Sequence, residues 1–409
     1  MTIQTCHNNL YSYLQRTNEI VSGVVEENDF LWEFEPLKRF ETMPNVDMFV
    51  ISITEQCNLR CSYCCYSGIY TNNRSHSNLS MTEDDVNSII QFIKGVVHAR
   101  PVRIAFYGGE PLTQFPLIQY AIMKATDELN YEKTFSISTN GTLLSKDKID
   151  WLIEHEVELH ISIDGTAQYH DANRKDVLGH GTFERIHKAL EYICDNHSDY
   201  LSKVLLLMTL PSIDMLAIIA EQWQQDNILR NISPTKITGL APNFSQGMNK
   251  AEWEHVKGQH LHLLDVYEAH LEYLVLKTYF HQCISYWKNR PIVEAVGPIP
   301  MATCLPLNAK LYFDAKMQIG VCEKISDSIR IGNIQYGINW DKANDLVTKY
   351  YEKRVHRCAH CPAIRMCDLC LTAVEFTEDQ WNILCHNERL YARLNMLLFC
   401  EMAERRMIA

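Results

Sequence analysis

The sequence predicts an α/β protein, in which a mostly parallel sheet is covered by helices and is followed by a cysteine-rich region. Two observations predict this class. From residue 48 to about residue 239, six short apolar runs alternate with amphipathic stretches of helical period. Such alternation indicates βαβ units, and six of them suit a partial (β/α)6 barrel. Seven of the fifteen cysteines then lie between Cys304 and Cys385, after the alternation has ended.

The elements follow in a regular order. The predicted strands are residues 48–54, 102–106, 134–138, 158–163, 203–209 and 233–239. The predicted helices between them lie near residues 82–98, 115–129, 146–155, 181–196 and 213–225. After about residue 245 we expect a helical segment at 250–281, a hairpin at 309–322 and a terminal helix near 377–405. Because active sites of such barrels lie at the carboxyl ends of the strands, residues directly after a strand are the first candidates for chemistry.

These patterns divide the chain into five predicted segments. Residues 1–45 carry no motif, and we expect an N-terminal extension that holds a peptide partner or packs on the barrel. The later segments are the barrel (46–245), a helical linker region (246–300), a cysteine-rich domain (301–390) and a C-terminal helix (391–409).

Composition indicates a soluble protein and excludes some classes of function. The chain has 409 residues, of which 46% are hydrophobic and 22% charged, as in ordinary globular proteins of two or three domains. Its net charge of -12 argues against nucleic acid or an anionic membrane as the main partner. The absence of a signal peptide and of a run of ~20 apolar residues predicts a cytoplasmic protein. Crowded cysteines in that reducing compartment are better interpreted as metal ligands than as disulfides.

The most informative motif is the C-x3-C-x2-C loop of Cys57, Cys61 and Cys64, directly after the strand at 48–54. Three thiolates at this spacing can hold one cubane 4Fe-4S cluster and leave its fourth iron without a protein ligand, free to bind a substrate or cofactor. Cys65 is too close in sequence to complete the same cube easily. A zinc site or a chance group of cysteines is the alternative.

A second motif, Gly108-Gly109-Glu110, follows the predicted strand at 102–106. Two glycines let the backbone approach a ligand closely, and a carboxylate beside them can accept hydrogen bonds from an ammonium group. A plain tight turn is the structural alternative. Together with the upstream cysteine loop, in which Tyr63 precedes Cys64, this motif resembles the signature of radical S-adenosylmethionine (SAM) enzymes.

The resemblance implies a TIM-like radical SAM barrel and a set of cofactor contacts. Gly108, Gly109 and Glu110 would contact the methionine amino group of SAM, and Arg174 would pair with its carboxylate, for which a guanidinium is suited. The remaining cofactor contacts that it implies are Tyr63, Ser138, Asn140 and Ser162. The last three could equally be turn residues with satisfied hydrogen bonds, and Arg174 could form a surface salt bridge.

The second cysteine group comprises Cys304, Cys322, Cys358, Cys361, Cys367, Cys370 and Cys385. Seven thiols are too many for one tetrahedral metal, and they nearly supply two four-iron clusters. The pattern resembles the SPASM domain, an auxiliary-cluster module of radical SAM enzymes that often act on peptides. By this resemblance the nearer cluster is held by Cys304, Cys322 and Cys370, and the farther one by Cys358, Cys361, Cys367 and Cys385. A zinc knuckle at 358–370 is the alternative.

The chain departs from the SPASM pattern in three ways. The last pair of cysteines, Cys367 and Cys370, is separated by two residues where the family usually has three, and Met317 stands where a glycine is usual. No cysteine lies a few residues before Cys304. The nearer cluster therefore either keeps an open iron, or is closed by Cys283.

A narrower resemblance lies just past the first cluster loop. Residues 66–70 (YSGIY), followed by Arg74 and His76, are similar to a segment of maturases that act on ribosomally made peptides. We therefore predict a radical SAM/SPASM peptide maturase that cleaves SAM to a 5'-deoxyadenosyl radical and abstracts hydrogen from a precursor-peptide residue. The product would be a side-chain cross-link through a C-C, C-O or thioether bond. Asp314 is a conceivable acid/base residue, with a β-turn role as its alternative.

The implied cofactors are SAM and three 4Fe-4S clusters, one in the barrel and two auxiliary. The implied partners are a precursor peptide and a flavodoxin- or ferredoxin-type electron donor, with no nucleic acid and no membrane. One rival function is a sulfatase-type maturase that oxidises Cys or Ser to formylglycine. A rival from another class is an iron-sulfur electron carrier or redox sensor, which has no use for an ammonium-binding turn at Gly108-Gly109-Glu110.

Overall fold

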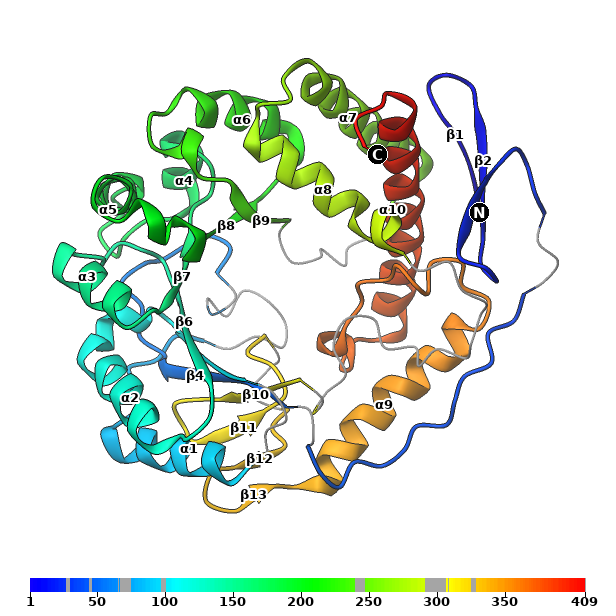
Figure 1. Cartoon of the computed structure of the whole chain (residues 1–409). Coiled ribbons are helices and arrows are strands. Elements are labelled where there is room, and N and C mark those ends of the chain that lie inside the picture. Colours follow the sequence, from blue (N-terminus) through cyan, green and yellow to red (C-terminus); the bar gives the residue numbers. More distant parts are fainter. Residues whose placement is uncertain are drawn as a thin grey trace.

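A computed structural model of the chain describes residues 1–26, 30–43, 46–64, 66, 75–96, 101–239, 247–290, 307, 309–324 and 329–408. It has an α/β architecture, in which helices surround a sheet that is parallel over most of its width (Figure 1). The predicted fold class is therefore confirmed.

The six predicted strands of the barrel are confirmed, each within two residues at either end. They are β4 (Met48–Thr54), β5 (Val102–Gly108), β6 (Lys133–Thr139), β7 (Glu158–Ser162), β8 (Val204–Leu210) and β9 (Pro234–Gly239). They pair in parallel in the spatial order β4-β5-β6-β7-β8-β9. Since all six run in one direction, the loops after them gather at one edge of the sheet.

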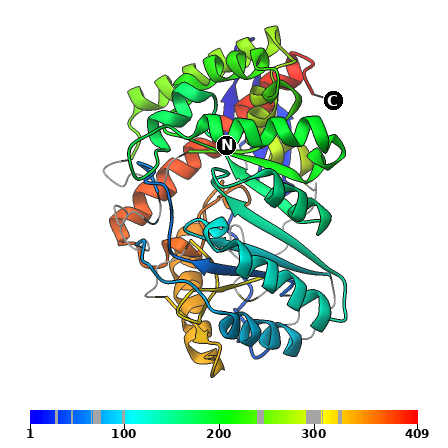
Figure 2. The ribbon, with the colours of Figure 1, turned by 90° about the vertical axis from the view of Figure 1, so that its left-hand side faces the viewer.

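The helices between the strands cover the outer face of the sheet (Figures 1 and 2). The predicted ones are α1 (Glu83–Gly95), α2 (Phe115–Glu128), α3 (Lys146–Glu154), α5 (Phe183–Asn196) and α6 (Leu216–Gln225). A short helix that the sequence pattern missed, α4 (Ala167–Asn173), follows β7. With seven residues it is too short to show a helical period.

Helix α1 shows why these segments fold as they do. Thr82 and Asp85 form a capping box, in which each side chain accepts a hydrogen bond from the other residue's backbone N–H. Such a cap contributes about 1 kcal/mol. The buried residues Val86, Ile89, Ile90 and Ile93 recur every three or four positions, and this apolar face packs against the sheet.

The predicted hairpin is confirmed as β10 (Lys310–Phe313) and β11 (Gln318–Gly320). Its place in the fold was not predicted. Strand β10 pairs in parallel with β4, so the hairpin extends the barrel sheet, and β12 (Gly332–Asn333) and β13 (Gly337–Ile338) add two short antiparallel strands beyond it. The strand that carries the first cysteine loop thus lies beside the hairpin that leads to Cys322.

The helical segment predicted at 250–281 is two helices, α7 (Lys250–Ala269) and α8 (Leu274–Asn289). No glycine or proline marks the break near His270, so the sequence pattern gave no signal for it. Helix α9 (Trp340–Cys358) was also not predicted. The terminal helix is confirmed as α10 (Glu378–Glu404), which crosses the predicted domain boundary at residue 390.

The N-terminal residues form a separate antiparallel sheet of β1 (Thr2–Gln4), β2 (Leu10–Leu14) and β3 (Glu19–Ser22). It lies beside α10 (Figure 1), where Ile3 and Tyr13 pack against Trp287 and Met396. Hydrogen bonds from Thr5, Asn9 and Tyr11 to Glu404 fasten the same contact. This extension therefore packs on the C-terminal helices.

No helix among the described residues is both long enough and apolar enough to span a membrane.

Candidate active site and cysteine-lined pocket

The loop that carries Cys57, Cys61 and Cys64 leaves the carboxyl end of β4 and is held by the segment that follows α4. The Arg60 N–H donates to the Lys175 carbonyl (2.8 Å) and the Ser62 N–H to the Asn173 carbonyl (3.0 Å). A hydrogen bond of 3.2 Å from the Cys64 N–H to the Cys61 carbonyl closes the turn between two of the cysteines. Backbone hydrogen bonds therefore help to fix the path of this loop.

The three thiols share one partly buried region. Burial is the main cause that raises the pKa of Cys57 to about 12 and that of Cys61 to about 11. The charges of Cys61 and Cys64 raise the Cys57 value further, whereas Arg174 opposes the rise at Cys61. Metal binding requires thiolates, so a bound metal has to supply the stabilisation that these thiolates lack.

The two glycines at the end of β5, Gly108 and Gly109, are required by close packing of the backbone. A Cβ atom on Gly108 would lie 2.1 Å from the Thr54 carbonyl oxygen, and one on Gly109 would lie 2.2 Å from that of Gln56. Gly108 also has a φ of +139°, which side chains disfavour. The sequence suggested approach to a ligand as the reason for these glycines. The structure shows a second reason: because they lack side chains, these glycines can pack directly against the backbone at the start of the cysteine loop.

The carboxylate of Glu110 joins the ends of two neighbouring strands. It is fully buried and accepts hydrogen bonds from the Leu112 N–H (3.0 Å), the Thr139 hydroxyl (2.7 Å) and the Asn140 N–H (2.7 Å). Burial raises the pKa of Glu110, and these three donors oppose the rise. Sequence reasoning missed this anchoring role, because no signal in the sequence indicates where the partner strand ends.

Asn140 connects the end of β6 with the cysteine loop. Its Nδ2 donates to Asn58 Oδ1 (2.9 Å) and lies 4.0 Å from the Cys57 sulfur. Ser138 and Ser162, at the ends of β6 and β7, are half-buried. The structure therefore brings all three predicted contacts to the same edge of the sheet as the cysteines.

Arg174 forms a buried ion pair with Asp164 near the cysteine loop. Its Nε donates to Asp164 Oδ2 at 2.8 Å, and both side chains are buried. The hydroxyl of Tyr63 also donates to this carboxylate oxygen, and the Thr209 N–H donates to the other. His170 accepts from the Asp164 N–H, and burial, aided by the charge of Arg174, lowers its pKa to about 3. The surface salt bridge considered from sequence is thus a buried one.

The residues just past the loop fall partly outside the described part of the chain. Cys65, residues 67–70 and Arg74 are among those outside it. His76 is described, and its Nε2 lies 3.6 Å from the Cys64 sulfur. This contact raises the pKa of His76.

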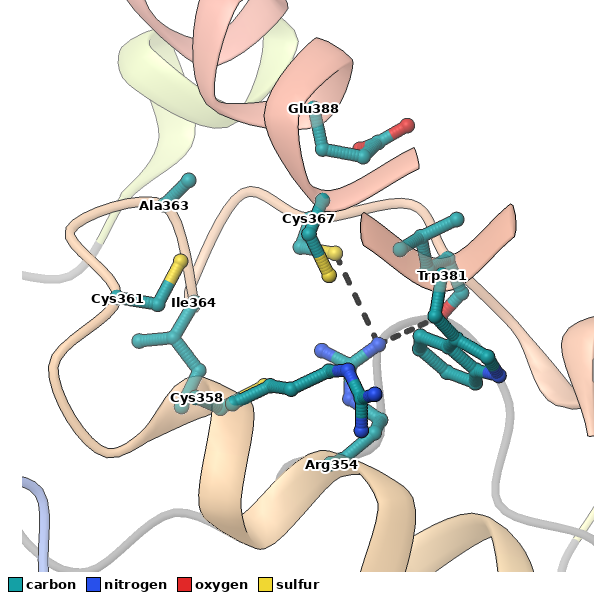
Figure 3. Close-up of a pocket in the computed structure, with 11 residues that line it drawn as sticks. Arg354, Cys358, Cys361, Ala363, Ile364, Cys367, Trp381 and Glu388 are labelled. Carbon is teal, nitrogen blue, oxygen red and sulfur yellow. Dashed lines mark hydrogen bonds between the residues drawn. The ribbon is translucent and has the colours of Figure 1, made fainter. Parts of the chain in front are cut away.

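The second cysteine group includes a pocket between α9 and α10 (Figure 3). Four of its lining residues are Cys358, Cys361, Cys367 and Cys385, the set predicted to hold the farther cluster. The other residues that line it are Arg354, Arg357, Ala363, Ile364, Leu369, Trp381 and Glu388. They come from α9, from α10 and from the connection between these two helices.

Arg354, which the sequence analysis did not identify, extends from α9 toward this pocket (Figure 3). Its Nη1 donates to the Leu369 carbonyl (2.9 Å) and the Tyr350 hydroxyl (3.1 Å), and lies 3.7 Å from the Cys367 sulfur. Its Nε and Nη2 atoms have no hydrogen-bond partner among the described residues, although the residue is only 1% exposed. Arg354 lies one turn before Cys358 on α9, but no motif in the sequence includes it.

Four thiols beside an uncompensated buried cation fit an anionic iron-sulfur cluster. Thiolates are the ligands that iron-sulfur clusters use, and buried donors without partners require an acceptor. The indole N–H of Trp381 and the Nε of Arg357, both lining the pocket, also have no partner among the described residues.

The predicted nearer group is only partly described, since Cys304 lies outside the described residues. Burial is the main cause that raises the pKa of Cys322 to about 11, and the charge of Cys370 contributes, so the two thiols lie within range of each other's charge. Cys283, on α8, interacts instead with Tyr279. Asp314 accepts hydrogen bonds from the Lys316 and Gln318 N–H groups in the hairpin turn and pairs with Arg330, which supports its turn role.

Comparisons with known proteins agree with this geometry. A sequence model of the radical SAM superfamily matches residues 51–218. A cysteine-type anaerobic sulfatase-maturating enzyme of Clostridium perfringens is 29% identical over 152 residues, which cover 36% of this chain and 41% of that enzyme. The radical SAM cyclopropyl synthase TigE of Paramaledivibacter caminithermalis is 25% identical over 213 residues, covering 46% of this chain and 44% of TigE. The matches thus span less than half the length of either relative.

A solved structure resembles the chain over most of its length. This is the structure of native anSMEcpe with bound AdoMet. The two structures align over 88% of this chain and 97% of the anSMEcpe chain, with a TM-score of 0.65 and 17% sequence identity. At that identity the likeness concerns the fold. The matched sequence, the parallel barrel and the three-cysteine loop at the end of its first strand agree, and residues 51–218 form a domain that matches the radical SAM superfamily.

Proposed function

We propose that the protein is a radical SAM/SPASM maturase that acts on a peptide. The observation that carries this proposal is the loop of Cys57, Cys61 and Cys64 at the carboxyl edge of the barrel, with polar groups from the ends of β6 and β7 around it. These thiolates would hold a 4Fe-4S cluster with one open iron. When this site receives an electron, SAM bound there would supply a 5'-deoxyadenosyl radical, which is able to take hydrogen from an unactivated carbon.

The chain's own residues would bind and orient the cofactor. Arg174 has its Nε paired with Asp164, which would hold the guanidinium in place, and its Nη groups would bind the methionine carboxylate. Tyr63 shares the same Asp164 oxygen. Ser138, Asn140 and Ser162 supply short polar groups at the strand ends. In this proposal Gly108, Gly109 and Glu110 bind the methionine amino group, while Glu110 also joins β5 to β6.

The C-terminal region would hold two auxiliary clusters. The pocket of Cys358, Cys361, Cys367 and Cys385 supports the farther one, because it is lined by four thiols and by several donors that have no partner among the described residues. Cys322 and Cys370, with Cys304, would hold the nearer one. Such clusters can take up the electron released when a substrate radical is oxidised, so a cross-link forms with the net loss of two hydrogens from the peptide.

Two reactions on a peptide remain distinct within this proposal. The relative named as a sulfatase-maturating enzyme favours oxidation of a Cys or Ser to formylglycine. TigE, named as a cyclopropyl synthase, favours formation of a new bond. We propose cross-link formation as the first candidate, because residues 66–70 resemble peptide maturases. The electron donor would be a flavodoxin- or ferredoxin-type protein, and the setting the cytoplasm.

The experiment has two stages. Anaerobic, reduced protein should convert SAM to 5'-deoxyadenosine; an electron carrier or redox sensor would not. Co-expression with a peptide encoded beside this gene should then yield a peptide that has lost two hydrogens and resists labelling by an aldehyde reagent. A product that reacts with that reagent would establish the formylglycine alternative, and the absence of deoxyadenosine would contradict the proposal.

A further inference from the structure

We propose that Arg354 is the fixed counter-charge of the farther auxiliary cluster and raises the affinity of that cluster for an electron. The inference rests on the proposed cluster site of Cys358, Cys361, Cys367 and Cys385. It extends that site to a residue that is not a ligand, since Arg354 would act on the cluster through its charge and its N–H groups.

Arg354 is a buried cation, and its burial has an energetic cost. A guanidinium is charged at all ordinary pH values, and its burial without a counter-ion is strongly unfavourable. Among the described residues, its partners are the neutral Leu369 carbonyl, the Tyr350 hydroxyl and the thiols of Cys367 and Cys358. None of them neutralises a charge in the way that a carboxylate would.

Glu388 carries the carboxylate that could neutralise the charge of Arg354. Glu388 lines the same pocket, but it accepts a hydrogen bond from the Asp368 N–H at 3.0 Å and forms no ion pair with Arg354 in the described part of the chain. Burial is the main cause that raises the pKa of Glu388. The charge of Arg354 opposes this rise. Since no carboxylate among the described residues forms an ion pair with Arg354, its counter-charge would come from what the pocket holds.

The four cysteines of the pocket would bind a cluster that carries negative charge. A 4Fe-4S cluster with four thiolates carries two net negative charges when oxidised and three when reduced by one electron, with no bond made or broken and no proton required. A fixed cation beside it stabilises both states, and the reduced state more. Hydrogen bonds and charge near the sulfur atoms are known levers on cluster potential.

The chain offers a matched control one helical turn away. Arg357 lines the same pocket from α9, but its guanidinium pairs with Glu378 and donates to the Lys353 carbonyl. The charge of Arg357 is already neutralised, so its substitution should change the reduction potential of the cluster much less than substitution of Arg354.

The test is a potentiometric titration of the full-length, cluster-loaded protein, followed by electron paramagnetic resonance. Cys57→Ala, Cys61→Ala and Cys64→Ala are combined as background to remove the barrel cluster, and the signal of the farther cluster is identified as the one that Cys361→Ala abolishes. Iron content shows first whether that cluster is present. If it is absent from the parent protein, both the proposed site and this inference are wrong.

With the cluster present, Arg354→Gln should lower its equilibrium constant for reduction at least tenfold, which is about 59 mV for one electron. Arg354→Lys should retain most of the parent potential, and Arg357→Gln should shift it by less than half as much as Arg354→Gln. Loss of the cluster from Arg354→Gln but not from Arg354→Lys would also support the role of the charge.

Unchanged potentials in Arg354→Gln, or equal shifts in the Gln and Lys variants, would overturn the inference while leaving the cluster site intact. Loss of the cluster from both variants would do the same, because it would show that Arg354 supports the local fold through its shape and not the cluster through its charge.

Discussion

The barrel mouth and the C-terminal cysteine pocket differ in how much of their structure the protein supplies by itself. At the barrel mouth the buried charges have partners, since Arg174 pairs with Asp164 and Glu110 accepts three hydrogen bonds. In the pocket, Arg354 has neutral partners and two unpartnered nitrogen atoms among the described residues. The comparison indicates that the first site is organised by the protein itself, whereas the second would depend on the proposed cluster for charge balance.

The largest expected effect is at the barrel mouth. Cys57→Ala, Cys61→Ala and Cys64→Ala should each abolish reductive cleavage of SAM, because each would remove one of three protein ligands of the cluster. Cys65→Ala is the matched control and should keep most of the cleavage. Deoxyadenosine formed by the anaerobic, reduced protein is the measurement. Full cleavage by Cys61→Ala would contradict the assignment of the loop.

A variant of the nearer C-terminal group should separate the two regions. Cys370→Ala should spare SAM binding and at least part of uncoupled cleavage, yet stop peptide modification, because it would disable one auxiliary cluster. Cys283→Ala serves as the control, since Cys283 interacts with Tyr279, and it should leave modification unchanged. Deoxyadenosine and modified peptide are assayed separately. Normal modification by Cys370→Ala would show that this cluster is not needed, and loss of modification in Cys283→Ala would show that Cys283 completes it.

Glu110→Gln should weaken SAM binding by about ten- to a hundredfold, since a hydrogen bond to a charged group contributes roughly 1.5–3 kcal/mol. Thr139→Val is the control, because it removes one donor to Glu110 and leaves the carboxylate in place. Anaerobic titration of SAM and a thermal unfolding scan are run on both variants. If Glu110→Gln unfolds at a lower temperature but binds SAM normally, the residue joins the strands and does not contact the cofactor.

The smallest expected effect lies in the hairpin that joins the two regions. Met317 has a φ of +62°, the left-handed conformation that disfavours side chains. Met317→Gly should therefore be more stable than Met317→Ala by about 1 kcal/mol, the reverse of the usual order of these residues. Thermal midpoints at one scan rate compare the pair. A more stable Ala variant would show that the turn relaxes around its side chain.

The sequence predicted the barrel well because its signal is local. Strands such as 134–138 and helices such as 82–98 each show their own period and their own turn residues, and the cysteine loop follows its strand directly. The parallel pairing of β10 with β4 was not predicted, since it joins residues more than 250 positions apart and no local pattern records it. The break between α7 and α8 lacked any glycine or proline signal.

The site was predictable to the extent that its residues carry a motif. The resemblance to the SPASM pattern implied that Cys358, Cys361, Cys367 and Cys385 share one ligand set, and these four residues line one pocket. Arg354 has no motif, because its importance comes from burial and from the lack of a counter-ion, which only the folded chain reveals. For the same reason the anchoring hydrogen bonds of Glu110 could not be anticipated.

The central claim, that two separate regions hold iron-sulfur clusters, is tested most directly by iron and sulfide content after anaerobic reconstitution. The parent protein should bind about twelve irons, as three cubane clusters. Combined Ala substitutions of Cys57, Cys61 and Cys64 should leave about eight, and so should combined Ala substitutions of Cys358, Cys361 and Cys367. About four irons together with zinc in the parent protein, or loss of all iron in either variant, would contradict the account.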